Sequence, residues 1–592
     1  MEIREKIEAL RKLMAKNNLD AYIIPSADAH QSEYVAEHWK SRQWLSGFTG
    51  SAGTLVVTKE EAGLWTDGRY YIQAEKQLEN TGIKLFKMGL PSTPSHIDWL
   101  KKVLNKGATV GFDGRVISIS TLKEMEQKFK LKNINLNFID LIKDLWADRP
   151  AIPKDPIFIH EVIYAGKSRV QKLSEVREIM KEKEVDYYII ASLDDIAWLF
   201  NIRGCDVKNN PFVTSYAIVG LEEAWLFIDL YKVSNEISEI LMKDKINLCS
   251  YESINEFLSK LHKDNKSIYD PNKLNASLFN SLHKEIEKVE EKNLTTLIKA
   301  IKNEVEIENL RKCHINDSVA MVRFIKWIKE EVKKGSSLTE IDAENKLLNY
   351  RKERELFVGT SFDTIAGYKD HAAMMHYKAT PEITYSLKNQ GYFLVDSGGQ
   401  YLNGTTDITR TIALGALTEE EKRDFTLVLK AMISLSRLKF LYGATGSNLD
   451  IIARKPLWDL GLDYKCGTGH GVGFFSTVHE EPQRFHQVTN TFTLEKGMII
   501  TNEPGIYKEG KHGIRIENTL LVAENETTEF GEFLSFETIS FCPIDLEGIV
   551  IELLSPEEIQ WLNEYHKQVY EKLSPFLNKE EAQWLKEATK SL

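Results

Sequence analysis

Short segments in which apolar residues run together or alternate with polar ones predict the sheet structure of the last third of the chain. Residues 392–395 are a continuous apolar and aromatic run, which is typical of a buried strand. Residues 405–412 alternate polar and apolar side chains and predict a neighbouring strand, with a turn permitted by the glycines at 398–399. Residues 497–503 and 513–522 repeat this arrangement around a Pro-Gly step. We therefore expect two pairs of adjacent strands.

The first half of the chain contains an internal repeat. Residues 19–24 match residues 185–190, and each segment follows a charged amphipathic stretch that predicts a helix. Residues 54–62 then match residues 216–224 in the same order. A helix, strand, helix, hairpin order in both copies predicts two related domains of α/β type. The first copy differs from the second by an insertion at residues 28–43.

Prolines and a change of pattern indicate the domain boundaries. Three prolines between residues 150 and 156 mark a linker after the first copy. A long helical stretch begins near residue 300 and has the apolar stripe of a helix packed on a sheet. We therefore expect three domains, at residues 1–150, 151–300 and 301–592, and the last one ends in helices that pack on its own core.

Composition narrows the class of protein. The chain has 592 residues, too many for one core, and its 42% hydrophobic and 28% charged content is ordinary for a globular protein. A net charge of −11 argues against nucleic acid as a partner. Five scattered cysteines favour reduced thiols. Because the amino terminus lacks an apolar signal core and no long apolar run occurs, we predict a cytoplasmic protein that does not enter a membrane.

The strand segments carry a set of metal-binding residue types. The set is four carboxylates and one imidazole: Asp396, Asp407, His470, Glu503 and Glu517. Two hard cations about 3.5–4 Å apart need bridging carboxylates and terminal ligands, and this set supplies both. Each residue alone has an ordinary explanation, such as an aspartate that forms a turn. All five in order, each in its own distinctive segment, predict a site for two divalent cations.

The histidine of this set lies in a glycine-rich run at residues 466–473. Alternate glycines let the backbone approach another group closely while one side chain projects from it. The run lacks the G-x-G-x-x-G spacing and the lysine of a phosphate-binding loop, so it does not predict a nucleotide site. We expect His470 to be a ligand.

Short motifs around these residues resemble those of the pita-bread metallopeptidases, peptidase family M24. The motifs lie at residues 395–398, 406–407, 469–471, 478–480, 502–505 and 516–518, with further similarity at 361–368 and 376–377. The resemblance is closest to the long, three-domain form of Xaa-Pro aminopeptidase and extends over nearly the whole chain. It implies two creatinase-type α/β domains followed by a pita-bread catalytic domain of α+β type.

The resemblance implies a role for each candidate ligand. Asp407 and Glu517 would bridge the two metals, Asp396 would complete one site, and His470 with Glu503 would complete the other. A hydroxide that bridges the metals would attack the Xaa-Pro bond, because cations lower the pKa of bound water. Manganese suits an oxygen-rich set with one imidazole, with cobalt and zinc as alternatives.

The same resemblance implies further catalytic residues around the metals. Glu503 would also assist proton transfer, and His376 and His479 would hydrogen-bond the substrate and the tetrahedral intermediate. Arg515 and Tyr507 would hold the Asp396 carboxylate in place. The implied activity is release of the first residue from peptides with proline at the second position, by a homodimeric enzyme.

Two departures and two alternatives accompany this interpretation. Cys466 stands where many relatives carry a histidine, and we interpret it as a small buried hydrophobe in preference to a reactive thiol. Glu481 stands where a glycine is common.

An Xaa-Pro dipeptidase (prolidase) would use the same five ligands but accept no residue beyond proline. A non-catalytic pita-bread protein that binds peptides is the other alternative.

Overall fold

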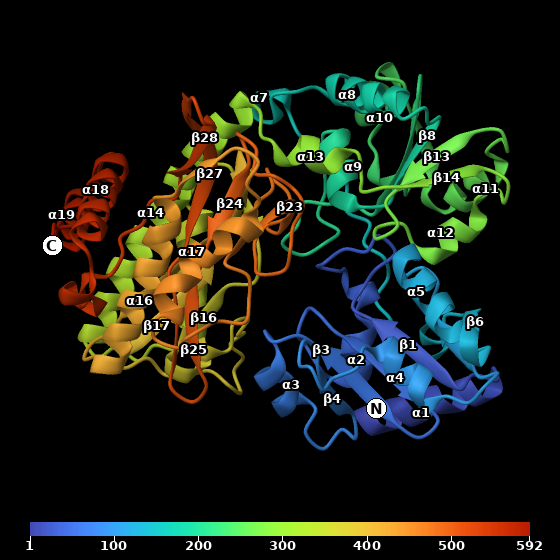
Figure 1. Cartoon of the computed structure of the whole chain (residues 1–592), viewed down its shortest axis with the longest axis horizontal. Coiled ribbons are helices and arrows are strands. Elements are labelled where there is room, and N and C mark those ends of the chain that lie inside the picture. The colour runs from blue at the N-terminus through green and yellow to red at the C-terminus, as the bar shows by residue number, and fades with distance from the viewer. The chain divides into compact units, whose positions relative to one another are not determined.

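The computed structural model describes residues 1–592 and divides into two compact units (Figure 1). Unit 1 comprises Met1–His160 and Lys167–Thr296. Unit 2 comprises Glu161–Gly166 and Leu297–Leu592. Unit 1 therefore contains both copies of the repeat, and unit 2 contains all five candidate metal ligands.

The first copy of the repeat is a six-stranded sheet with the order β4-β3-β2-β1-β5-β6. β1 pairs antiparallel with β2 and parallel with β5, so the sheet is mixed. Its strands are β1 (Ala21–Pro25), β2 (Thr54–Thr58), β3 (Ala62–Thr66), β4 (Lys84–Lys87), β5 (Thr109–Phe112) and β6 (Asn135–Phe138). Its longer helices are α1 (Ile3–Lys16), α3 (Tyr71–Gln77), α4 (His96–Val103) and α5 (Ile119–Phe129), and α2 (Ser41–Ser46) begins within the last residues of the insertion.

The second copy has the same strand order and the same directions, as β12-β11-β10-β8-β13-β14. Its strands are β8 (Tyr187–Ile190), β10 (Ser215–Gly220), β11 (Ala224–Ile228), β12 (Ile246–Ser250), β13 (Lys266–Tyr269) and β14 (Glu287–Glu290). Its helices include α8 (Arg169–Glu182), α9 (Leu193–Leu199), α10 (Asn235–Lys243), α11 (Ile254–Lys260) and α12 (Ala276–Ser281). Matching strand orders confirm the repeat and the prediction of two related α/β domains.

Equivalent aspartates begin the central strand of each copy and make the same contact. The Asp20 carboxylate accepts the Thr109 N–H at 2.8 Å, and the Asp186 carboxylate accepts the Lys266 N–H at 2.8 Å. In both copies the bond joins the start of the central strand to the start of its parallel neighbour. The sequence match therefore preserves a register-setting contact as well as the apolar pattern.

The insertion in the first copy packs against the second copy within unit 1. His30 is buried, its ring nitrogens lying 2.8 Å from the Ala191 carbonyl and 3.0 Å from the Tyr251 hydroxyl. Asn275 donates to the Ala29 carbonyl at 2.8 Å. Trp39 belongs to the hydrophobic cluster of the second copy. Burial lowers the pKa of His30, which favours the neutral ring.

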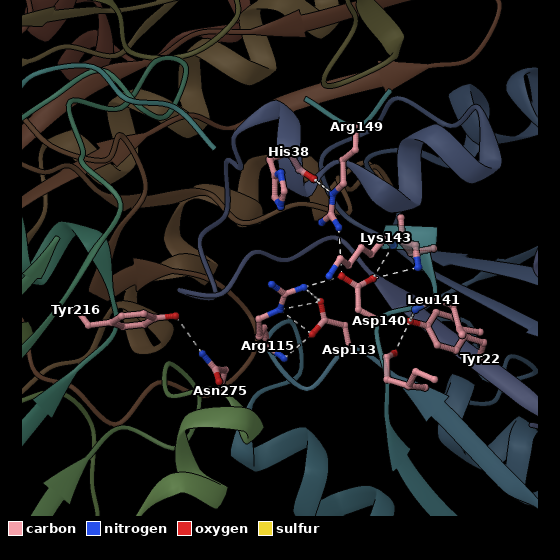
Figure 2. Close-up of polar contacts among 12 residues, drawn as sticks. Tyr22, His38, Asp113, Arg115, Asp140, Leu141, Lys143, Arg149, Tyr216 and Asn275 are labelled. Carbon is pink, nitrogen blue, oxygen red and sulfur yellow. Dashed lines mark hydrogen bonds and ion pairs between the residues drawn. The ribbon is translucent and has the colours of Figure 1, made fainter. Parts of the chain in front are cut away.

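A charged network anchors the linker that follows the first copy (Figure 2). Arg115 binds Asp113 at 2.8 Å and Asp140 at 2.6 Å, next to the carboxyl ends of β5 and β6. Arg149, which precedes the linker prolines, binds Asp140 at 3.3 Å. Both guanidinium groups lie over the Trp39 ring, at 5.2 and 5.5 Å from its centroid. These contacts hold the linker and the insertion next to the carboxyl ends of β5 and β6 in the sheet of the first copy.

Unit 2 is built on α14 (Glu304–Lys333), a helix of 30 residues that begins at the capping box of Asn303 and Glu306. Its sheets have the orders β16-β17-β20, β15-β18-β19 and β21-β28-β27-β24-β22-β23, and β25 pairs with β26. The helices α18 (Pro556–Leu573) and α19 (Lys579–Ala588) contact α14. The prediction that the C-terminal helices pack on their own domain is confirmed.

The strands of unit 2 differ from the predicted ones in their bounds, and the expected strands at 405–412 and 513–522 are each divided in two. They are β15 (Phe357–Thr360), β16 (Ile365–Tyr368), β17 (Tyr392–Ser397), β18 (Gly399–Tyr401), β19 (Gly404–Thr405), β20 (Ile408–Ala413), β21 (Lys439–Leu441), β22 (Gly469–Gly471), β23 (Glu480–Phe485), β24 (Ile499–Asn502), β25 (Gly505–Lys508), β26 (His512–Arg515), β27 (Asn518–Thr528) and β28 (Gly531–Thr538). The remaining long helices are α15 (Glu340–Lys352), α16 (Glu419–Ser436) and α17 (Gly446–Trp458).

The strand expected at 405–412 is broken at Thr406 and Asp407, because the chain changes partner there. β19 pairs with β18, whereas β20 pairs with β17. A Cβ at Gly398, where the chain leaves β17, would lie 1.9 Å from the Thr406 carbonyl oxygen. Only glycine permits this approach, so the break at Asp407 depends on it.

Replacing Trp39 by alanine tests whether the insertion supports the second copy. Trp39→Ala should lower the free energy of unfolding of unit 1 by about 3–5 kcal/mol, because a buried aromatic ring leaves a cavity. Urea denaturation followed by circular dichroism measures this. Phe530, which is 79% exposed in the turn between β27 and β28, is the matched aromatic control. Phe530→Ala should change the stability by no more than about 0.5 kcal/mol, and an equal effect of both substitutions would contradict the packing role.

Candidate metal centre

Two adjacent strands bring Asp396 and Asp407 to the same pocket. Asp396 lies near the end of β17 and pairs across the sheet with Thr409 of β20. Asp407 directly precedes β20, so its side chain is not fixed by a ladder position. Asp396 and Asp407 are 7% and 4% exposed. The two strands are neighbours, as the 11-residue offset predicted, but Asp407 lies one residue outside the second strand.

A second pair of strands brings Glu503 and Glu517 to the same place. β24 and β27 pair so that Asn502 lies opposite Asn518. Glu503 directly follows β24, and Glu517 directly precedes β27. The Glu503 N–H donates to the Thr468 carbonyl at 2.8 Å, which ties this position to the glycine-rich run. Each glutamate therefore occupies a strand break, as Asp407 does.

His470 lies at the centre of the short strand β22, next to β24. A Cβ at Gly469 would lie 1.9 Å from the Thr501 carbonyl oxygen, so glycine is required for the two strands to meet. The His470 N–H donates to the Thr501 hydroxyl at 3.0 Å. The ring nitrogen Nδ1 lies 2.9 Å from the Gly471 carbonyl, which leaves Nε2 to face the carboxylates.

The candidate ligands converge around His470. Its Nε2 lies 3.5 Å from Oδ2 of Asp407 and 3.4 Å from Oε1 of Glu503. One ligand atom each of Asp407, His470 and Glu517 lies within 4.8 Å of the other two. Four of the five predicted ligands therefore meet at one point of unit 2.

Asp396 joins them through Arg515 and Thr409. The Arg515 Nη2 group binds the Asp396 carboxylate, and its Nη1 donates to the Tyr507 hydroxyl at 2.7 Å. The Arg515 Nε donates to the Thr409 hydroxyl at 3.1 Å, which in turn donates to Glu517 at 2.8 Å. Of the predicted pair, Arg515 contacts Asp396 directly, whereas Tyr507 contacts Arg515. Thr409 was not singled out from the sequence, although its place two residues after Asp407 in an alternating strand is a usable signal.

Burial, reinforced by neighbouring negative charge, raises the pKa of Asp407, Glu503 and Glu517. Burial, and then repulsion by Glu517 and Asp396, raises the pKa of Asp407 well above its ordinary value. Burial, and then repulsion by Glu503, does the same to the pKa of Glu517. Burial together with the charge of Asp396 raises the pKa of Glu503 to about 7. The cluster is therefore short of positive charge.

The residues present fit divalent cations. Oδ1 of Asp396 and Oε1 of Glu517 are buried oxygens that accept no hydrogen bond. Buried carboxylate oxygens without partners are costly, and a cation satisfies them. Oxygen donors with one imidazole match hard or borderline divalent metals, whereas no thiolate is needed.

The other predicted site residues lie close to this cluster or in segments that lead to it. The His479 ring packs edge-on against the His470 ring, with centroids 4.3 Å apart. His376 is half-buried between the 3₁₀ turn at Lys369–Ala373 and β17. Its neighbour Tyr377 donates to the buried Glu340 at 2.8 Å, which anchors that segment.

Burial, and then the charge of Glu503, raises the pKa of the Cys466 thiol to about 12, which favours the inert interpretation of Cys466.

Comparisons with known proteins agree with this arrangement. Residues 6–147 and residues 148–306 each match the family of the Creatinase/Prolidase N-terminal domain. Residues 308–524 match Metallopeptidase family M24, and residues 532–592 match the C-terminal region of peptidase M24. The chain is 41% identical to Xaa-Pro aminopeptidase 1 of Dictyostelium discoideum, over 98% of this chain and 94% of that one. It is 40% identical to aminopeptidase P2 of Arabidopsis thaliana, over 97% and 86%.

A solved structure agrees over the full length. The crystal structure of X-prolyl aminopeptidase from Caenorhabditis elegans, described as a cytosolic enzyme with a di-nuclear active site, superposes with a TM-score of 0.96. It is 34% identical, and the match covers 100% of both chains. The chain belongs to the Xaa-Pro aminopeptidases of metallopeptidase family M24.

Membership of this family confirms the predicted fold class. Two creatinase-type domains precede an M24 catalytic domain, and the sheets are mixed as expected. The chain is an enzyme of the metallopeptidase type, as predicted. None of its helices combines the length and the apolar character needed to cross a bilayer.

Thr409 provides a test of the bonding around the metal centre. Thr409→Val keeps the side-chain shape but removes the hydroxyl that links Glu517 to Arg515. Metal affinity, measured by competition with a chelator, should fall by about 10–100-fold, because the supporting bonds orient the ligands. Thr589→Val is the control, because that hydroxyl donates to a carbonyl of its own helix. Unchanged affinity in the Thr409 variant would show that the hydroxyl does not orient Glu517.

Proposed function

We propose that this chain is a two-metal Xaa-Pro aminopeptidase that releases the first residue of peptides whose second residue is proline. The observation that carries the proposal is the convergence of Asp407, Glu503 and Glu517 around the His470 ring, with Asp396 joined through Arg515. The relatives over nearly the full length are named for the same activity. A di-nuclear active site in the nematode relative supports two metal ions.

Five residues would hold the metals: Asp407 and Glu517 between them, Asp396 on one, and His470 and Glu503 on the other. Bound there, two divalent cations would lower the pKa of an attacking water and would act as Lewis acids toward the scissile carbonyl. Manganese remains our proposed metal because of the donor set. The supporting bonds from Arg515 and Thr409 keep the carboxylates apart in fixed orientations before metal arrives.

The chain's own residues supply the remaining chemistry. Glu503 would take a proton from the attacking water and return it to the proline nitrogen, and its 21% exposed side chain beside His470 supports this role. His479 would donate a hydrogen bond to the oxyanion, which its packing against His470 supports. His376 is proposed to hydrogen-bond the substrate. The acidic pocket attracts the free ammonium of the peptide.

The remaining features of the proposal extend beyond the site. We propose domain boundaries near residues 150 and 300, a homodimeric assembly and a cytoplasmic location. The nematode relative is described as cytosolic, which supports the location. The family matches at residues 6–147, 148–306 and 308–524 support the boundaries. The partners are peptides with proline in the second position, and no nucleic acid or membrane partner is proposed.

The deciding assay compares a tripeptide with a dipeptide. Protein loaded with Mn²⁺ should release free arginine from Arg-Pro-Pro. Cleavage of Arg-Pro alone would instead identify a prolidase. Release from neither peptide, in protein that holds two metals per chain, would favour the non-catalytic peptide-binding alternative.

The bridging role of Asp407 gives a second expectation. Asp407→Asn removes a charge that both cations would share, so bound metal should fall below two per chain and activity should be abolished. Unit 1 should keep its thermal transition, because Asp407 lies in unit 2. More than a few per cent of wild-type activity in metal-controlled assays would rule out the bridging role.

His479→Ala separates an accessory histidine from a ligand. The variant should keep both metals, while kcat falls by about 10²-fold, as for the loss of an oxyanion donor. Elemental analysis and steady-state kinetics are both needed. Loss of metal from this variant would mean that His479 is a ligand and that the assignment of His470 must be revised.

A further inference from the structure

A fully buried ion pair, one partner of which directly follows His479 in the chain, is not used by the mechanism above. Lys302 and Glu480 are bonded through Nζ and Oε2, and both side chains are 0% exposed. The same ammonium donates to the carbonyl oxygens of Lys299 at 3.0 Å and Ala300 at 3.2 Å. The lysine is therefore held by three acceptors.

The pair connects two strands that flank the strand of His470. Glu480 is the first residue of β23 and directly follows His479. On the other side, the Lys302 N–H donates to the Gly497 carbonyl at 3.0 Å, at the approach to β24. The backbone of Lys302 thus contacts the segment just before β24, the strand that leads to Glu503, and its side chain contacts Glu480, the residue after His479. The strand of His470, β22, lies between β24 and β23 in the sheet.

Stability alone gives a weak reason for this pair. Removing a lysine and a glutamate from water costs free energy that their attraction often fails to recover, so apolar replacements of a buried pair are frequently neutral or stabilising. The two strands also have other links. Gln483 of β23 donates to the Ile499 carbonyl of β24 at 2.9 Å. The sheet therefore has the means to form without the ion pair.

We propose that Lys302 is a positioning residue that acts through Glu480 to hold the His479 ring against His470. The inference rests on the proposed function, since it assigns Lys302 a part in the turnover that His479 assists. A carboxylate fixed at the first residue of β23 fixes the backbone from which His479 projects. The ring contact at 4.3 Å between His479 and His470 is the geometry that this constraint maintains.

The experiment uses an apolar replacement of both partners in the full-length enzyme. Lys302→Met/Glu480→Met leaves no buried charge unpaired, so it avoids the collapse expected when one partner is removed. Bound metal, thermal stability, and kcat and KM for Arg-Pro-Pro are measured together. We expect two metals per chain, stability equal to or above that of the wild type, and a kcat lowered about 10²-fold with KM changed little, as for a catalytic group misplaced by about 1 Å.

A matched control is the buried pair of Lys232 and Asp206 in unit 1, whose side chains are 1% and 0% exposed. Lys232→Met/Asp206→Asn should leave kcat unchanged.

If Lys302→Met/Glu480→Met keeps two metals and full kcat, the pair is only structural and the positioning role is wrong. If it loses metal, Lys302 supports the ligands and the proposed path through His479 is wrong. The proposed function itself is rejected separately, if the wild-type enzyme cleaves neither Arg-Pro-Pro nor Arg-Pro. The outcomes for the double variant do not test that point.

If the double variant fails to fold, Lys302→Arg decides the question. Arginine keeps the positive charge but shifts the position of Glu480. A folded Lys302→Arg enzyme with two metals and a lowered kcat supports positioning, whereas wild-type kcat overturns it. In a His479→Ala background, Lys302→Arg should lower kcat no further, because a residue that acts through His479 has nothing left to position.

Discussion

Repulsion between carboxylates is the constraint on which the catalytic unit depends. Asp396, Asp407, Glu503 and Glu517 approach one another in a place that excludes most water, where like charges oppose each other strongly. Nothing in their own chemistry would bring them together. The surrounding sheets do so, because β17 pairs with β20 and β24 pairs with β27 in fixed registers. Arg515 offsets part of the charge, and the remainder is available to attract cations.

The same strand breaks explain how the site is both rigid and accessible. Asp407, Glu503 and Glu517 each lie one residue outside a strand, so their neighbours are fixed by the ladder while their own side chains turn out of it. A carboxylate within a continuous strand would point to a face set by the pleat. Interrupting the strand at its functional residue relaxes that rule without loosening the sheet. The glycines at 398 and 469 permit the close backbone contacts that these breaks require.

Sequence patterns predicted the repeat, the fold class and the candidate ligands, but not the details that hold them. Alternation along residues 405–412 indicated a strand, yet it carries no information about the change of partner at Asp407. Arg515 was expected to support Asp396, and it does. Thr409 and Lys302 were missed because their importance arises from residues more than 100 positions away in the chain. Long-range partners of this kind become visible only when the sheets are assembled.

The insertion in the first copy has a consequence for how unit 1 is made in the cell. Ala29 accepts a hydrogen bond from Asn275, which follows it by 246 residues. At a synthesis rate of about 5–20 residues per second, the insertion leaves the ribosome roughly 12–50 s before its docking edge exists. During the first part of that interval Ala191, whose carbonyl contacts His30, has not been synthesised, whereas Trp39 can already meet Arg115 and Arg149 of the first copy. The first copy can form its own sheet during translation, but the docking of its insertion on the second copy must wait, so an early-emerging segment completes one of the last packing steps of the unit.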